Sequence, residues 1–234
     1  MTVDKHRLSQ AKTTAIVGFS VFNEQEQVFL SDRETNDEKK LRAVITDDLY
    51  KSFISSYAKK LNVKVLKPTE LITNPYYLQM IKRYGTFDNQ YRAHSVNYRN
   101  NKMLTAAAFF KMTPQEKLEL AKALRVDSIL GVESMIYETR SHNSTFTIFN
   151  IEKNSKRYSY NYRATLTELE LYDQLSAKPI VVVKNLISSS TEQYDKQHYD
   201  NRIESKKEDG QAMILAMDLM VDKLTDEMLN GSSK

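Results

Sequence analysis

The chain has 234 residues, of which 41% are hydrophobic and 27% are charged, and its formal net charge is +4. This length is typical of one folded domain, and the presence of only 5 glycines and 4 prolines excludes a long Gly- or Pro-rich linker. The absence of cysteine excludes disulfides, zinc thiolate sites and cysteine nucleophiles within this sequence.

The first part of the chain predicts a strand, a long helix and a second strand. Residues 1–12 carry no apolar run and are predicted to form a flexible segment. The β-rich apolar run over residues 13–22 predicts a buried strand. Apolar residues then recur at helical spacing over residues 41–61, which predicts an amphipathic helix of about 20 residues. Residues 63–68 predict a second strand that Pro68 ends.

Residues 69–112 predict an insertion, or a helical excursion, with short helices broken at Asn74 and Pro75. Between Leu78 and Met112 this segment also concentrates positive charge, because six basic residues stand there against Asp88 alone. The six are Lys82, Arg83, Arg92, Arg99, Lys102 and Lys111. Such a segment favours a solvated surface over an anionic partner, and both interpretations stay open.

The stretch that begins at Thr113 predicts a helix followed directly by a strand over residues 128–137. Thr113 is suited to cap the helix, Pro114 fits its first position and Glu116 completes a capping box. The inner stripe of this helix is expected to be Leu118, Ala121 and Leu124. A helix that runs into a strand with almost no loop is a compact α/β unit.

Beyond this unit the apolar residues alternate, which predicts a hairpin. Residues 144–152 and 157–172 predict two strands around a polar turn. The apolar side of the second strand moves from Leu166 to Leu169, which predicts a β-bulge near Thr167.

A turn then leads to a third strand over residues 180–188, with apolar residues on both faces. A Met-rich terminal helix follows, and Gly231 lies just past its end. Its methionines are expected to pack in the core, although a pliable partner groove is the alternative. Together these elements predict an α/β (α+β) fold, with a mixed sheet of long antiparallel hairpin strands packed by helices. We expect one domain over residues 13–231, with the insertion at about 69–112.

Three tyrosines alternate between basic residues in the second hairpin strand, and they are Tyr158, Tyr160 and Tyr162. In an extended chain they share one face with Ala164 and Leu166. A structural hairpin is the favoured interpretation of this pattern. A protein or glycan surface is the second, and a nucleic-acid-binding face, which combines basic and stacking residues, is the third.

No motif of catalysis or metal binding is found. His6, His94, His142 and His198 are scattered without ligand spacing, so no metal and no cofactor are expected. The sequence contains no Walker A loop, no G-x-G-x-x-G and no G-x-S-x-G. The acids Asp47 and Asp48 are interpreted as surface residues of a helix. The chain is therefore predicted not to be an enzyme.

Three stretches resemble the envelope domains shared by the curli-secretion lipoprotein CsgG, the TolB amino-terminal domain and the LpoB activator of penicillin-binding proteins. "AIVGFSVFNE" is similar to their opening strand and "LAKALRVDSILGVES" to their helix-to-strand unit. "LTELELYDQLSAKPIVVV" is similar to their hairpin, whose turn carries Tyr-Asp and a later Lys. The residues that carry these likenesses are Val126, Asp127, Gly131, Tyr172, Asp173 and Lys178. Residues 69–112 depart from the pattern, as does Ala177, which stands where a glycine is usual.

The resemblance implies a domain that binds other proteins in the bacterial envelope and has no catalytic residues to carry over. Many members are lipoproteins, whereas this sequence has no cysteine to lipidate. The resemblance also implies a periplasmic location, with an outer-membrane anchor if the native leader carries a lipidation signal.

Three hypotheses follow. The first is a non-enzymatic adaptor or scaffold in a secretion, flagellar or cell-wall assembly, with homo-oligomerisation and peptidoglycan binding left open. Its expected contact residues are Tyr158, Tyr160, Tyr162, Tyr91, Arg92, Tyr98 and Arg99. The second is a cytoplasmic nucleic-acid-binding module, which the modest net charge disfavours and whose binding would weaken steeply with salt. The third is an enzyme with a site assembled from dispersed residues.

Overall fold

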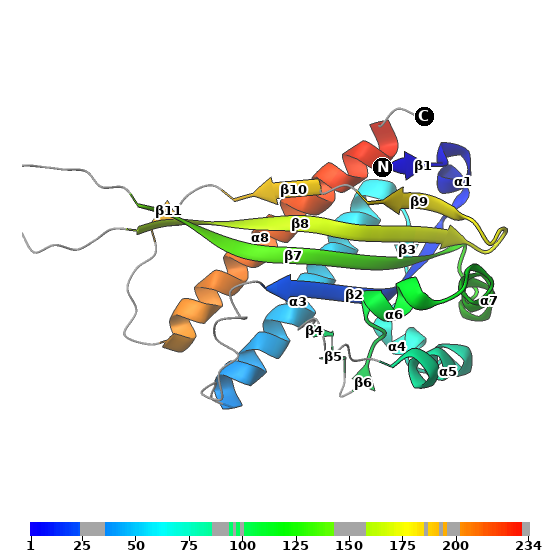
Figure 1. Ribbon diagram of the computed structural model, residues 1–234, viewed down its shortest axis with the longest axis horizontal. Helices are drawn as coiled ribbons and strands as arrows, with labels where there is room; N and C mark the ends of the chain where they lie inside the picture. Colours follow the sequence, from blue (N-terminus) through cyan, green and yellow to red (C-terminus); the bar gives the residue numbers. More distant parts are fainter. Residues whose placement is uncertain are drawn as a thin grey trace, which may run out of the picture.

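The computed structural model describes the chain in nine stretches, which include its first and last long elements. The described residues are 1–23, 36–85, 94–95, 97–98, 101–142, 158–184, 187–191, 194–195 and 202–230. They form a mixed sheet with helices on both faces (Figure 1), which confirms the predicted α/β class.

The sheet is mixed because its central strands run both parallel and antiparallel. Among the described residues its strands are β1 (Thr2–Val3), β2 (Thr13–Asn23), β3 (Lys64–Val65), β4 (His94–Ser95), β7 (Ser128–His142), β8 (Tyr158–Asp173), β9 (Pro179–Val183), β10 (Ile187–Ser190) and β11 (Tyr194–Asp195). The central order is β1-β9-β8-β7-β2-β3, with β2 parallel to both β7 and β3 and with β8 antiparallel to β7 and β9. A separate pair consists of β5 (Asn97–Tyr98) and β6 (Asn101–Lys102).

The long β7–β8 pair contains the predicted bulge. Glu133 lies opposite Glu168 and the next residue, Ser134, lies opposite Leu166, so Thr167 is the extra residue. Its hydroxyl donates to the main-chain oxygen of Glu133 and to Oε1 of the same residue, both at 3.0 Å. The predicted strand over residues 144–152 lies outside the described residues.

The strand predicted over residues 180–188 is two strands in the structure. Both run along the same edge of β8, where β9 pairs with residues 169–172 and β10 with residues 163–166. The apolar run therefore predicted strand structure correctly, but it did not show the break between the two strands.

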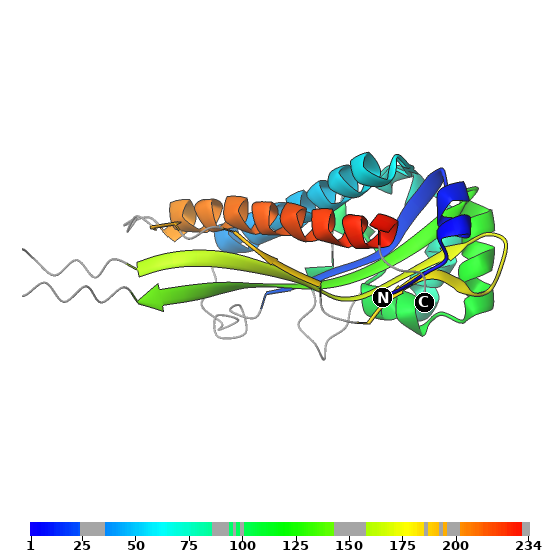
Figure 2. The same ribbon diagram turned by 90° about the horizontal axis from the view of Figure 1, so that it is seen from above.

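Two long helices cover one face of the sheet, namely α3 (Asn36–Leu61) and α8 (Arg202–Asn230). They lie side by side in Figure 2. Asp218 on α8 accepts hydrogen bonds from Ser52 Oγ and, at 2.7 Å, from Ser56 Oγ on α3. The methionines Met217, Met220 and Met228 are fully buried, which confirms the prediction that α8 packs in the core.

Shorter helices lie on the opposite face, at the end of the sheet where β8 turns into β9 (Figures 1 and 2). They are α4 (Pro68–Leu71), α5 (Pro75–Tyr84), α6 (Ala106–Lys111) and α7 (Pro114–Leu124). The capping box of α7 forms as predicted, because Glu116 N donates to Thr113 Oγ1 at 3.2 Å and Thr113 N to Glu116 Oε2 at 2.8 Å. Leu118, however, is only partly buried, and Lys117 and Leu120 lie deeper.

Residues 69–112 contribute to the core of this layer. Tyr77 is fully buried, and its hydroxyl donates to Val17 O at 2.9 Å and accepts from Leu104 N at 3.0 Å. Arg83, one of the six basic residues, forms an ion pair with Glu116, so α5 is tied to α7. The described part of this segment is therefore integrated with the sheet.

Phe109 joins the short-helix layer to the sheet at two glycines. A Cβ added to Gly131 on β7 would lie 2.0 Å from Phe109 Cδ1, and one added to Gly18 on β2 would lie 2.7 Å from Phe109 Cβ. The ring is fully buried, and burial of a phenylalanine contributes about 2 kcal/mol. The two strands thus need glycine because the helix approaches so closely.

The amino-terminal segment is ordered in the structure, which corrects the prediction of flexibility for residues 1–12. Its strand β1 pairs with β9, and a short helix α1 (Lys5–Gln10) follows. Arg7 binds the Asp173 carboxylate through two hydrogen bonds, of 2.6 and 2.7 Å. Burial opposes ionisation of Asp173, but the hydrogen bonds from Arg7, Ser176 and Leu175 hold its pKa below the ordinary value. Sequence periodicity missed this link because its partners lie far apart in the chain.

The close approach of Phe109 generates a prediction for two glycine substitutions. Gly131→Ala should lower the free energy of unfolding by at least about 2 kcal/mol, because the added methyl overlaps a fixed ring. Gly210→Ala is the matched control. Its Cβ would meet a single aliphatic side chain, with Ile45 Cγ1 at 2.9 Å and Cδ1 at 3.0 Å, within a helix that gains about 1 kcal/mol from alanine. Urea unfolding followed by circular dichroism measures both. Equal effects at the two sites would contradict the packing assigned to Phe109.

Candidate functional site

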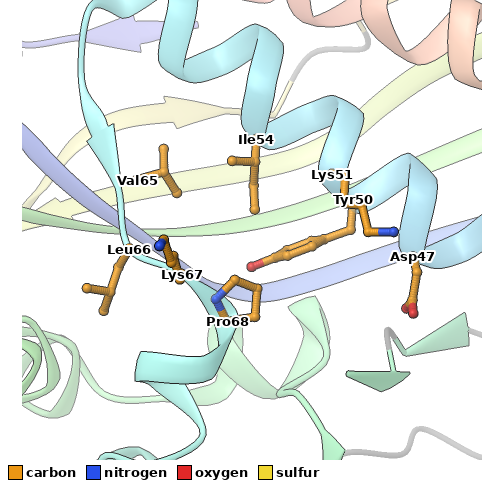
Figure 3. Close-up of a pocket in the computed structure, with 8 residues that line it drawn as sticks. All are labelled: Asp47, Tyr50, Lys51, Ile54, Val65, Leu66, Lys67 and Pro68. Atoms are coloured by element: carbon orange, nitrogen blue, oxygen red, sulfur yellow. The ribbon is translucent and has the colours of Figure 1, made fainter. Parts of the chain in front are cut away.

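A pocket of about 270 Å³ lies between α3 and the chain that leads from β3 into α4 (Figure 3). Its described lining residues are Asp47, Tyr50, Lys51, Ile54, Val65, Leu66, Lys67 and Pro68. The pocket is therefore built from the first crossover of the fold, where the chain leaves β2, forms α3 and returns as β3.

One wall of the pocket is a face of α3, and the other is the chain that runs from β3 to Pro68. Asp47, Tyr50, Lys51 and Ile54 are three, four and seven residues apart, so they share one face of α3. The opposite wall follows β3, and there Pro68 takes the first position of α4, where its missing N–H costs no hydrogen bond. The two walls meet around an aliphatic interior.

Tyr50 is a fixed part of this interior. Its side chain is buried, its hydroxyl donates to Ile16 O at 3.3 Å and its ring meets Phe19 edge to face at 5.1 Å. Burial, with a further contribution from the neighbouring Tyr77, raises the pKa of Tyr50 well above its ordinary value. The residue is accordingly a neutral, immobile wall.

The polar groups of the pocket are Asp47, Lys51 and Lys67. Lys51 pairs with Asp48 at 2.8 Å on the outer side of α3. Oδ1 of Asp47 is buried and accepts no hydrogen bond. Burial raises the pKa of Asp47, against the opposing effect of Lys51 and with a further contribution from Asp48. Asp47 was interpreted as a surface acid, and helical phase alone does not reveal that one of its oxygens is covered.

The chemistry of the pocket suits binding of a small apolar group. Ligand pockets that hold whole cofactors or drug-sized molecules occupy roughly 300–1,000 Å³. A volume of about 270 Å³ lies just below that range. Aliphatic walls with lysines at the rim supply contact area and charge.

A second cluster of charged and aromatic residues lies on the opposite face of the sheet and is structural. The ammonium of Lys117 on α7 is 2.7 Å from Glu170 Oε2 and lies 4.7 Å and 4.6 Å from the ring centres of Phe109 and Tyr172. Burial and Glu170 raise the pKa of Tyr172 to about 12. Lys117 was not predicted from the sequence, although its spacing of three and four residues from Leu120 and Ala121 places it on the buried face.

The contact residues predicted from sequence are not among the described pocket residues. Tyr162 shares a buried face with Ala164 and Leu166, as its alternation predicts, but at 1% exposure it belongs to the core and is not a contact surface. Tyr158 and Tyr160 lie on β8 opposite His142 and Arg140. Their side chains lie outside the described residues.

The predicted contact residues of the 69–112 segment lie mostly outside the described residues. Tyr98 is in β5, with its side chain not described, and Tyr91, Arg92 and Arg99 fall in the gaps. Among the described residues, no group of three or more His, Asp or Glu side chains is placed to hold a metal ion. None of the described helices combines the length and apolar composition needed to cross a lipid bilayer.

Comparison with known proteins assigns no family. No protein-family model matches the chain, and no curated protein is similar to it at a significant level. Among solved structures, the lipoprotein GNA1162 from Neisseria meningitidis is 12% identical and aligns over 84% of this chain and 93% of its own, with a TM-score of 0.29. Similarity at that level transfers neither a fold nor a function.

The buried oxygen of Asp47 generates a prediction about pH. Asp47→Asn should increase stability at about pH 7, because the folded state disfavours the charged carboxylate. The gain should fade as the pH falls through the raised folded-state pKa and be lost at about pH 3, below the unfolded pKa of about 4, since both states are then protonated. Urea unfolding at the two pH values measures this difference. A gain of the same size at both, or a loss at about pH 7, would contradict the assignment.

Proposed function

We propose that this chain is a non-enzymatic scaffold that binds a partner protein in the bacterial envelope, through the edge of the sheet at β3 and the adjoining pocket. The observation that carries the proposal is the position of the pocket. Val65, Leu66 and Lys67 line it directly after or within an edge strand, so a docking cavity and an open sheet edge adjoin each other (Figure 3).

The edge is defined by the strand order. Among the described residues β3 ends the central order of strands and pairs with β2 alone. Lys64 N donates to Lys12 O and Leu66 N to Thr14 O, both at 2.8 Å. Since main-chain groups of alternate residues point to opposite sides of a strand, those of Val65 point away from the sheet. An open edge of this kind is a template for a chain from a partner.

The site is also rigid, as a recognition surface requires. Tyr50 is held through Ile16 on β2, and Phe53 and Tyr57 of the same helix are fully buried against the sheet. Leu71 of α4 is fully buried as well, so the chain that follows the pocket is also anchored in the core. Preorganised walls reduce the entropy lost when a partner binds.

The envelope part of the proposal is supported by the three stretches that resemble envelope domains. They form β2, the α7–β7 unit and the β8–β9 hairpin, which are the element types expected for them. The machine that the chain serves, and its attachment to a membrane, stay predictions from that resemblance.

Site-specific photo-crosslinking in cells tests the proposal. A benzophenone amino acid placed at Lys51 or Lys67 should capture one defined partner, identified by mass spectrometry and recovered with the envelope fraction. Lys122, which is exposed on α7 at the opposite face, is the control position and should not capture it. Equal capture at all three positions, or no capture at the pocket, would refute the site. A cytosolic partner would refute the envelope location.

A further inference from the structure

We propose that the partner presents an extended segment in which aliphatic and acidic residues alternate, and that this segment adds to the outer edge of β3 with one aliphatic side chain in the pocket. This inference rests on the proposed function of the same site. It names the chemistry that the site recognises, and it follows from the main chain, the cavity and the charges around it.

The main chain of β3 offers the incoming segment only a short edge. The strand spans only Lys64 and Val65, and Pro68 begins a helix three residues later. Only Val65 turns both of its main-chain groups outward within the strand, so the edge offers few hydrogen bonds. The edge therefore aligns the segment, while affinity and register must come from side chains.

The pocket supplies the register. Val65 lines it from the strand, and Ile54 and Tyr50 line it from α3 (Figure 3). A side chain that leaves the added strand on the α3 side enters this space. Leucine or isoleucine suits its aliphatic walls, because burial of such a side chain is favourable and needs no polar partner. A charged side chain placed there would lose most of its hydration shell against the aliphatic walls.

The charges at β3 select acidic residues. Lys64 and Lys67 are exposed, and neither ammonium forms an ion pair with a described residue. Because side chains alternate along a strand, Lys64 lies on the face opposite to Val65, whereas Lys67 lines the pocket. Acidic residues on either side of the aliphatic anchor therefore lie on the face of Lys64 and can form an ion pair with it. An acidic residue at the mouth of the pocket can form an ion pair with Lys67. Alternation of aliphatic and acidic residues satisfies both faces.

The experiment is a titration of the full chain with synthetic peptides, measured by fluorescence anisotropy. The probe is a labelled, capped peptide of sequence Glu-Val-Asp-Leu-Glu-Val-Asp. Three control peptides change one feature each: lysine replaces every acid, glycine replaces the central leucine, or N-methyl groups block the main chain on one edge. These controls leave the protein unchanged, so no folding defect confuses the result.

The acidic probe should bind, and the lysine, glycine and N-methyl peptides should each bind at least about tenfold more weakly. The variant Lys64→Glu/Lys67→Glu should weaken the probe by about tenfold or more, whereas Lys122→Glu should not change it. Raising NaCl from about 0.05 M to about 0.5 M should also weaken binding.

Equal binding of the acidic and lysine peptides would overturn the charge argument, and equal binding of the N-methyl peptide would overturn strand addition. No binding of any peptide would overturn the inference as a whole. If crosslinking at Lys51 or Lys67 still captured an envelope partner, only the chemistry of the segment would be wrong. If capture failed as well, the proposed function would fail with it.

Discussion

The contact between Phe109 and two strand glycines determines how the layers of this protein fit together. Its ring occupies the space that a side chain at Gly131 would need, and its Cβ approaches Gly18 on the neighbouring strand. Lys117 on α7 and Tyr172 on β8 also lie against the ring. Because Phe109 meets β2, β7, β8 and α7 at once, the position of the short helices relative to the sheet has little freedom.

The same constraint reaches the candidate site through Tyr77 and Tyr50. The Tyr77 hydroxyl joins Val17 on β2 to Leu104 before α6, while the Tyr50 hydroxyl joins α3 to Ile16, the adjacent residue on β2. One strand therefore carries hydrogen bonds from the layers on both of its faces. The pocket between α3 and α4 is held by this strand, and that arrangement makes it suitable as a preformed binding surface.

Features determined by neighbouring residues were predictable from the sequence, whereas features determined by distant partners were not. The Thr167 bulge shifts the alternation of its own strand, and the α7 capping box lies within four residues, so both could be predicted. The ion pair between Arg7 and Asp173 joins residues 166 positions apart, and nothing in residues 1–12 signals it. The pocket is of the same kind, because its walls come from α3 and from the turn after β3.

A preformed pocket requires the three layers to behave as one cooperative unit, since a pocket on a separately unfolding layer would not be preformed. Native-state hydrogen exchange tests this most directly, because the amides of Leu104 and Phe109 belong to the short-helix layer and those of β7 to the sheet. We predict that they exchange with free energies of opening within about 1 kcal/mol of each other. Exchange of Leu104 and Phe109 at several kcal/mol below β7 would show that the layers open independently, and would contradict the account.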